Sequence, residues 1–513
     1  MASGHFDDKL TLPYAAYMNE HVDVLVVGAG LSGIGAGYHL QTLCPKRSYA
    51  ILEGRSQLGG TWDLFRYPGI RSDSDMYTLG FVFKPWTHAK AIADGPAILQ
   101  YLNETAREHG IDRKIRYRHW VERADWSSQD ARWTVDISRG ETKERVQMTC
   151  NFLFTCSGYY NYENGYTPPF ADIERFAGRI VHPQHWSDDI DYAGKRVVVI
   201  GSGATAVTLV PELAKHAAHV TMLQRSPTYI VSRPSQDAIA NKLRALLPAR
   251  VAYSLTRWKN VLYGMWIYAL SRRKPDAVRD KLLSLARAEL GPDYDIATHL
   301  TPRYNPWDQR LCLVPDSDLF KALKANSAEI VTDQIDRFNQ RGIALKSGKQ
   351  LDADLIITAT GLDLKLLGGM AISVDGARVE LPATISYKGM MFSGVPNLAS
   401  SFGYTNASWT LRADLICEYV CRLLNHMERT GTRQCTPRLN DPSVTAQDWV
   451  SLTSGYFQRS QHKLPKQGSK APWQARQNYV SDLLNIKFAR VDDGVMEFGN
   501  AIDHLRNKTV SMT

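Results

Sequence analysis

The sequence is poor in cysteine. Seven cysteines occur among 513 residues, and no two of them form a CxxC pair. A disulfide scaffold requires a dense and even set of cysteines, and zinc ribbons and dithiol redox motifs require close pairs, so these classes are excluded. Six cysteines stand within or beside apolar runs, where a reduced and buried thiol is usual. These six are Cys44, Cys150, Cys156, Cys312, Cys417 and Cys421.

Long apolar runs are also missing. No uninterrupted run reaches the roughly 18 apolar residues of a bilayer-spanning helix. The first twenty residues contain no segment typical of a signal peptide. We therefore expect a cytoplasmic protein. Disorder is excluded for most of the chain, because 44% of the residues are hydrophobic and only 22% are charged.

Positive charge is in excess and is unevenly distributed. The net charge is +9, and the segment from Ser232 to Cys312 holds 14 basic and 7 acidic residues. Such a segment can face nucleic acid, a membrane surface or a phosphorylated cofactor, although a solvated surface is the simplest interpretation. We expect no nucleic-acid partner.

A strand, a glycine-rich turn and a helix open the folded part. VDVLVV at 22–27 predicts a buried strand, and GAGLSG follows with Gly28, Gly30 and Gly33. Gly28 permits a tight turn, Gly30 lets backbone N–H groups approach a pyrophosphate, and Gly33 lets the helix pack closely on the strand. Glu53 ends the next predicted strand, where a carboxylate can accept both ribose hydroxyls. The segment therefore predicts a dinucleotide site.

The same pattern returns in the second third of the chain. VVVIGSGATA carries Gly201, Gly203, Thr205 and Ala206 at the corresponding positions. The strand that follows ends in Arg225 and Ser226 rather than in a carboxylate. A guanidinium can grip a 2′-phosphate that a carboxylate would repel, so this unit favours NADP over NAD. A surface arginine without a ligand is the alternative. The two units together indicate a bound FAD and a visiting NADPH.

This duplication predicts an α/β fold with two Rossmann-like dinucleotide-binding domains, the second containing a helical insertion. We expect the first part of an FAD-binding domain over 1–160. An NADPH-binding domain is expected over 161–345, with the insertion at about 235–300. The segment 346–513 is expected to return to the FAD-binding domain, with a helix over 410–426 and a C-terminal tail.

The insertion contains one apolar stripe at three- and four-residue spacing. Its members are Ala252, Leu255, Trp258, Leu262, Met265 and Ala269, whereas Arg257, Lys259 and Asn260 lie off it. We expect the stripe to pack over the active site or against a partner subunit. Because Arg272, Arg273 and Lys274 stand beside it, peripheral contact with a membrane surface is the alternative, and self-association stays open.

Two motifs give the chain a family resemblance. GGTWDLFRYPGIRSD, from Gly59 to Asp73, is similar to the signature of flavin-dependent Baeyer–Villiger monooxygenases and matches it at every specified position. FAGRIVHPQHW resembles the second fingerprint of that family, with Phe176, Gly178, His182 and Trp186 correctly spaced. Ser187 departs from the proline or aspartate that usually follows. The segments 302–320 and 388–411 resemble the ethionamide-activating branch, and the similarity extends over nearly the whole chain from about residue 20.

The resemblance implies roles for particular residues. Gly60, Thr61, Trp62 and Asp73 would belong to the flavin site. Arg310 would be the permanent cation at the flavin, and Asp73 would orient it. Phe176, Gly178, His182 and Trp186 would couple the two nucleotide domains. We expect no metal, because no cysteine or carboxylate stands at ligand spacing from His182 and His185.

The resemblance also implies a reaction. NADPH would reduce FAD, dioxygen would form a C4a-peroxyflavin, and one oxygen atom would enter a ketone to give an ester or a lactone. Small apolar ketones are the expected substrates, with sulfides or thioamides beside them. Heteroatom oxidation as the main activity and a non-oxygenating NADPH–flavin reductase are the alternatives. A disulfide reductase would need a redox cysteine pair, which CEYVC at 417–421 does not resemble. A non-catalytic NADPH sensor would have no need of Arg310 and Asp73.

Overall fold

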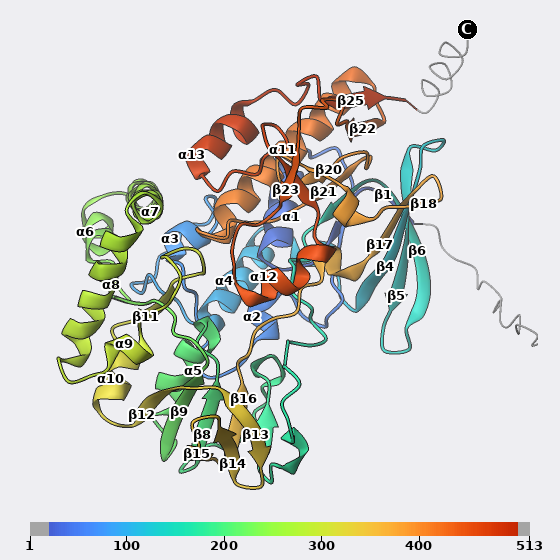
Figure 1. Ribbon diagram of the computed structural model, residues 1–513. Helices are drawn as coiled ribbons and strands as arrows, with labels where there is room; N and C mark the ends of the chain where they lie inside the picture. Colours follow the sequence, from blue (N-terminus) through green and yellow to red (C-terminus); the bar gives the residue numbers. More distant parts are fainter. Residues whose placement is uncertain (1–19, 501–513) are drawn as a thin grey trace, which may run out of the picture.

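The structure, a computed structural model, describes residues 20–500. Two sheets dominate it, the larger at the upper right of Figure 1 and the smaller at the bottom. The helices of the insertion form the left flank of the molecule, away from the larger sheet. Among the residues described, no helix is long and apolar enough to cross a membrane.

The larger sheet has nine strands. Eight of them follow the spatial order β18 (Ala377–Arg378), β17 (Ala371–Val374), β4 (His119–Ser127), β5 (Arg132–Arg139), β6 (Glu144–Thr155), β1 (Glu20–Val27), β2 (Tyr49–Leu52) and β3 (Ile115–Arg116), and β21 (Leu398–Ser400) pairs with β6. The strands around β1 are parallel, whereas β4, β5 and β6 form an antiparallel meander. The expected strands at 22–27 and 49–52 are confirmed.

Three helices cover the parallel part of this sheet. They are α1 (Leu31–Leu43), α4 (Gly95–Glu108) and α11 (Trp409–Thr430). Ile34 and Leu40 of α1 pack with Leu415 of α11 in the buried core between helices and strands. The helix expected over 410–426 is confirmed, and it ends at Gly431, whose φ of 67° suits a left-handed helix cap.

The smaller sheet is entirely parallel. Its strands are β12 (Ala328–Thr332), β9 (His219–Gln224), β8 (Arg196–Ile200), β16 (Leu355–Thr358) and β7 (Arg179–Val181) in spatial order. On one side lie α5 (Ala204–Leu213) and α10 (Asp318–Lys324), and on the other a three-stranded sheet of β13 (Ile335–Asn339), β14 (Gly342–Leu345) and β15 (Gln350–Asp352). The predicted α/β fold with two dinucleotide-binding units is confirmed.

The expected boundary after residue 345 cuts through the smaller sheet. β16 pairs with both β7 and β8, so the second unit extends to Thr358. β17 and β21 then return to the larger sheet. The boundary was misplaced because the sequence of a short buried strand does not indicate which sheet the strand will join.

The insertion is helical, as expected, but half of its apolar stripe is exposed. It consists of α6 (Ala238–Leu246), α7 (Ala249–Arg273), α8 (Pro275–Leu290) and α9 (Ile296–His299). Leu255, Trp258 and Leu262 are exposed, whereas Arg257 is buried. The expectation that the stripe packs over the active site is wrong for these three residues, because α7 docks through the face that carries Arg257.

Candidate active site

The first glycine motif is built for close backbone approach. Gly28, with φ 103°, follows β1, and a Cβ there would lie 2.7 Å from the carbonyl oxygen of Cys156. A Cβ on Gly33 would lie 1.8 Å from the Gly28 oxygen. Gly30 caps the start of α1 and faces Gly60, whose added Cβ would lie 3.0 Å from the Gly30 Cα. Side chains are therefore excluded where the positive end of α1 begins.

Glu53 directly follows β2 at the same edge of the sheet. Its carboxylate is buried and accepts hydrogen bonds from Ala29 N at 2.8 Å and Arg55 N at 2.9 Å. Burial raises the pKa of Glu53, and these two backbone donors oppose that shift. Each carboxylate oxygen retains a lone pair after these bonds, so Glu53 can still accept from a ligand hydroxyl.

A small cavity of about 70 Å³ joins these features. Gly28, Gly30, Glu53 and Gly60 line it, together with Trp120, Ser157, Tyr162 and Lys365. Narrow glycine walls, a helix N-terminus and a buried carboxylate fit the pyrophosphate and ribose of FAD.

Trp120, Tyr162 and Lys365 were not found from the sequence. They belong to no motif. Trp120 lines the cavity from the start of the antiparallel strand β4. Tyr162 carried a usable signal, because it follows β6, and the carboxyl ends of parallel neighbours such as β1 and β6 meet at one edge. Lys365 lies over the Trp120 ring at 5.7 Å.

The signature loop lies between the two units. Thr61 and Trp62 start the short helix α2 (Thr61–Leu64), next to Gly60. At the other end of the loop, a Cβ on Gly69 would lie 3.0 Å from the Glu212 Cβ and 3.1 Å from the Thr208 oxygen, both on α5. Burial raises the pKa of Tyr67 to about 12. The loop thus runs from the first glycine motif to the helix of the second unit.

The second glycine motif repeats the geometry of the first. Gly201 has φ 140°, and a Cβ there would lie 2.3 Å from the Ala359 oxygen. Gly203 precedes α5 with open space around it, and Thr205 and Ala206 lie in the first turn of that helix. The motif is therefore shaped for a second dinucleotide.

Arg225 and Ser226 follow β9 at the edge of this motif. Both are exposed, and the Ser226 carbonyl accepts a bond from the Ser202 hydroxyl at 3.0 Å. Within the described part of the chain, the Arg225 guanidinium makes no ion pair or hydrogen bond. It is therefore free to meet an anion.

Arg310 and Asp73 meet although 237 residues separate them. The guanidinium bonds both carboxylate oxygens, with Nη2 2.9 Å from Oδ1 and Nε 2.7 Å from Oδ2. Asp73 raises the pKa of Arg310, so the cation persists at every working pH. Burial raises the pKa of Tyr159, Tyr160 and Tyr456, and the positive charge of the nearby guanidinium opposes this shift in each.

The second fingerprint lies where the chain passes between units. Phe176 is buried, and a Cβ on Gly178 would lie 2.6 Å from the Asp354 oxygen and from the Phe176 ring. The His182 Nδ1 accepts a bond from Gln184 N at 3.2 Å, and its Nε2 lies 3.3 Å from the Gly361 oxygen. His182 thereby ties the segment before β8 to the segment after β16.

Two other predicted positions can now be placed. Trp186 is half-buried and packs edge-on against Tyr192 at 6.1 Å. The rings of His182 and His185 lie 6.3 Å apart. Over residues 20–500, no group of three or more His, Cys, Asp or Glu side chains lies close enough to hold a metal ion.

Family models and known proteins agree on the class of protein. A model described as flavin-binding monooxygenase-like matches residues 90–272, and one described as an NAD(P)-binding Rossmann-like domain matches residues 26–94. The FAD-containing monooxygenase EthA of Mycobacterium tuberculosis is 55% identical over 482 residues, covering 94% of this chain and 98% of that protein. The probable FAD-binding monooxygenase AlmA of Acinetobacter baylyi is 48% identical over 495 residues, covering 96% and 99%.

Solved structures share the fold at lower identity. An oxidised steroid monooxygenase bound to NADP has a TM-score of 0.75 and 21% identity, covering 94% of this chain and all of that one. The polycyclic ketone monooxygenase from Thermothelomyces thermophila has a TM-score of 0.73 and 17% identity, covering 96% and 91%. The two-unit architecture is thus that of known oxygenases. From its identity to the curated relatives over almost its full length, the chain belongs to the family of FAD-containing monooxygenases.

Proposed function

We propose that this enzyme uses FAD and NADPH to insert one oxygen atom of dioxygen into a small apolar ketone, giving an ester or a lactone. The observation that carries the proposal is the bidentate pair of Arg310 and Asp73. A mere reductase needs no fixed cation, whereas oxygen insertion develops negative charge on oxygen that a preorganised cation stabilises.

Arg310 provides that cation in a fixed place. Its two bonds to the same carboxylate restrict the orientation of the guanidinium. The remaining N–H groups stay available to an oxyanion, because arginine has five donors. The guanidinium is still partly exposed, so a small substrate can approach it from the solvent side.

Bound FAD supplies the oxygen-activating chemistry. Glu53 and the backbone around Gly28, Gly30 and Gly60 hold its nucleotide part, with Thr61 and Trp62 at the start of α2 beside it. The second motif, with Gly201, Gly203, Thr205 and Ala206, holds NADPH, whose 2′-phosphate meets Arg225 and Ser226. The fingerprint from Phe176 to Trp186 couples the two units through the His182 contact with Gly361.

The surroundings of Arg310 support the proposed substrate class. Tyr159 stacks on Trp409 at 5.5 Å and on Phe457 at 6.0 Å, so aromatic faces gather on this side of the cation. Such walls favour an apolar molecule with one polar atom directed at the guanidinium. The names of two solved oxygenases of the same fold, which refer to a steroid and to a polycyclic ketone, agree with that class.

The test compares two substrates of the same shape. The purified enzyme is given NADPH and air with a linear 2-ketone or with the matched dialkyl sulfide, and the products are identified by mass spectrometry. We expect an ester from the ketone. If the sulfide gives a sulfoxide and no ketone gives an ester, heteroatom oxidation is the main activity. NADPH oxidation that yields only hydrogen peroxide with both compounds would make the protein a flavin reductase.

A further inference from the structure

Helix α7 buries several polar side chains on its inner side and exposes large apolar side chains on its outer side. Thr256, Arg257 and Ser271 are buried against the rest of the protein. On the outer side, Trp266 is 58% exposed and Leu262 53% exposed. A helix at the surface of a soluble protein ordinarily has the opposite arrangement. The outer face of α7 is therefore shaped for something other than water.

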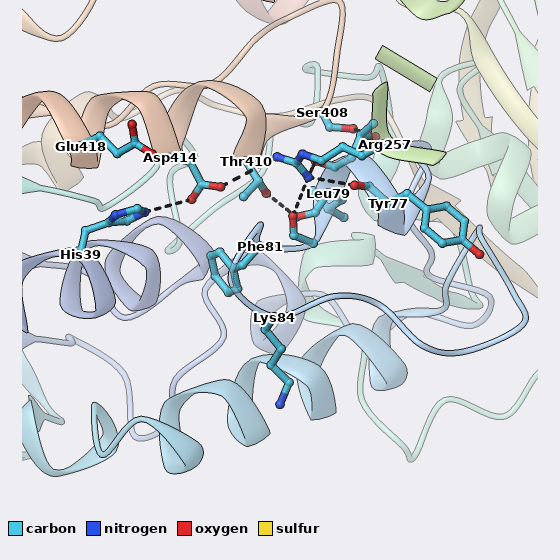
Figure 2. Close-up of polar contacts among 12 residues, drawn as sticks. His39, Tyr77, Leu79, Phe81, Lys84, Arg257, Ser408, Thr410, Asp414 and Glu418 are labelled. Atoms are coloured by element: carbon cyan, nitrogen blue, oxygen red, sulfur yellow. Dashed lines mark hydrogen bonds and ion pairs between the residues drawn. The ribbon is translucent and has the colours of Figure 1, made fainter. Parts of the chain in front are cut away.

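Buried polar contacts of Arg257 fix the inward face of α7. Arg257 Nη1 donates to the Tyr77 oxygen at 2.8 Å and to the Gly80 oxygen at 2.9 Å, as Figure 2 shows in part. Its Nη2 lies 3.9 Å from Asp414 on α11, and Asp414 in turn lies 3.6 Å from His39 on α1. If α7 rotated about its axis to bury its apolar side, the Arg257 guanidinium would lose its buried partners, which is strongly unfavourable.

The exposed apolar residues form one continuous face. Along α7 they recur at spacings of four, three, four and four, which places them on one side of the helix, and Leu246 at the end of α6 adjoins them. We call this the α6–α7 apolar face. It consists of Leu246, Val251, Leu255, Trp258, Leu262 and Trp266.

The charged residues within α6 and α7 themselves have a single sign. No aspartate or glutamate occurs between Asp237 and Asp276, whereas eight lysines and arginines do. Four of these are exposed and make no ion pair or side-chain hydrogen bond within residues 20–500: Lys242, Arg250, Arg273 and Lys274. Arg273 continues the apolar face, seven residues after Trp266.

We propose that the α6–α7 apolar face binds the surface of an anionic membrane. Two helices that carry an apolar face with tryptophans, several basic residues and no acidic residue have the composition of helices that lie in the lipid headgroup region. A second copy of the chain fits less well, because a twofold contact would set the same free cations against each other. This inference concerns a surface remote from Arg310 and does not depend on the reaction that the enzyme catalyses.

The test uses the full-length holoenzyme and vesicle flotation. Vesicles of phosphatidylcholine alone are compared with vesicles in which one third of the lipid is phosphatidylglycerol, at low and high salt. We expect binding to the anionic vesicles, weakened by salt. Arg250→Gln, Arg273→Gln and Lys274→Gln combined should weaken this binding about a hundredfold, at about fivefold for each basic residue.

The apolar contribution is tested separately. Leu262→Ser with Trp266→Ser should weaken binding at least tenfold. Leu43→Ser is the matched control, because Leu43 is also exposed, at 42%, but lies at the end of α1. Flavin content and thermal unfolding should be unchanged in all variants, since every altered side chain is exposed.

Three results would overturn the proposal. The first is no binding to either type of vesicle. The second is binding that Leu262→Ser with Trp266→Ser leaves unchanged. The third is a dimer, seen by light scattering, that this double variant dissociates, because the face would then be an interface between copies of the chain.

Discussion

At the scale of single residues, the contact between Arg310 and Asp73 is central to the proposed reaction. The two lie on different segments, and their bidentate contact fixes a charge that neither residue could hold in place alone. A reaction that develops negative charge on oxygen gains most from a cation that needs no rearrangement.

Replacing Arg310 tests that role. Arg310→Ala should lower ester formation by at least about a hundredfold, the usual cost of losing a charge-stabilising group. The flavin should still be reduced by NADPH, because reduction does not need this cation. Stopped-flow absorbance measures the reduction, and mass spectrometry measures the ester.

Arg303→Ala is the control for this variant, since Arg303 is an exposed arginine in the same segment. It should leave both rates unchanged. Ester formation by Arg310→Ala at the rate of the control would remove Arg310 from the mechanism.

Arg225 offers a second test at this scale. Its guanidinium has no partner among the described residues and stands at the end of β9. Arg225→Ala should raise the KM for NADPH by roughly 10- to 150-fold, the range for losing a hydrogen bond to a charged group. The KM for NADH, which has no 2′-phosphate, should hardly change. Equal losses for both coenzymes would contradict the assignment of the 2′-phosphate to Arg225.

At the scale of elements, the sequence predicted local patterns and missed distant partners. The strand, glycine turn and helix at 22–43 could be found because all three lie within one short segment. The periodicity of α7 correctly identified an apolar stripe. It could not tell which side would be buried, because this depends on carbonyls at Tyr77 and Gly80, about 180 residues away.

The contact of Arg257 with those carbonyls should be costly to lose. Arg257→Met should lower the free energy of unfolding by about 3–5 kcal/mol, because the buried carbonyl oxygens of Tyr77 and Gly80 lose their donor and Asp414 loses the neighbouring guanidinium. Urea unfolding measures the change. Arg273→Met, at an exposed position of the same helix, should cost less than about 0.5 kcal/mol. Equal costs for the two variants would show that α7 is held by other contacts.

At the scale of the whole molecule, the enzyme consists of two dinucleotide-binding units joined through a few segments. The sequence predicted both units but misplaced the border between them, because β16 is a short apolar strand that either sheet could have accepted. The Arg310–Asp73 contact was implied by resemblance alone, since no local pattern brings such distant residues together.

The joining segments make stability depend on pH. Burial lowers the pKa of His182 below its usual 6.5. The unfolded chain therefore takes up a proton more readily than the folded one, and the stability contributed by neutral His182 is lost as the pH falls below 6.5. His182→Gln should lose less stability than the wild type between about pH 8 and pH 5.5 in urea unfolding. An identical pH dependence in both proteins would mean that His182 is not held neutral by the fold. His299, whose pKa burial also lowers, contributes equally in both.

The most direct test of the account follows the oxygen atom. The enzyme is supplied with NADPH, a linear 2-ketone and oxygen-18 gas, and the products are analysed by mass spectrometry. We predict an ester that contains one heavy oxygen atom for each NADPH consumed. An unlabelled product, or NADPH consumption that yields labelled hydrogen peroxide and no ester, would contradict the proposed oxygen insertion.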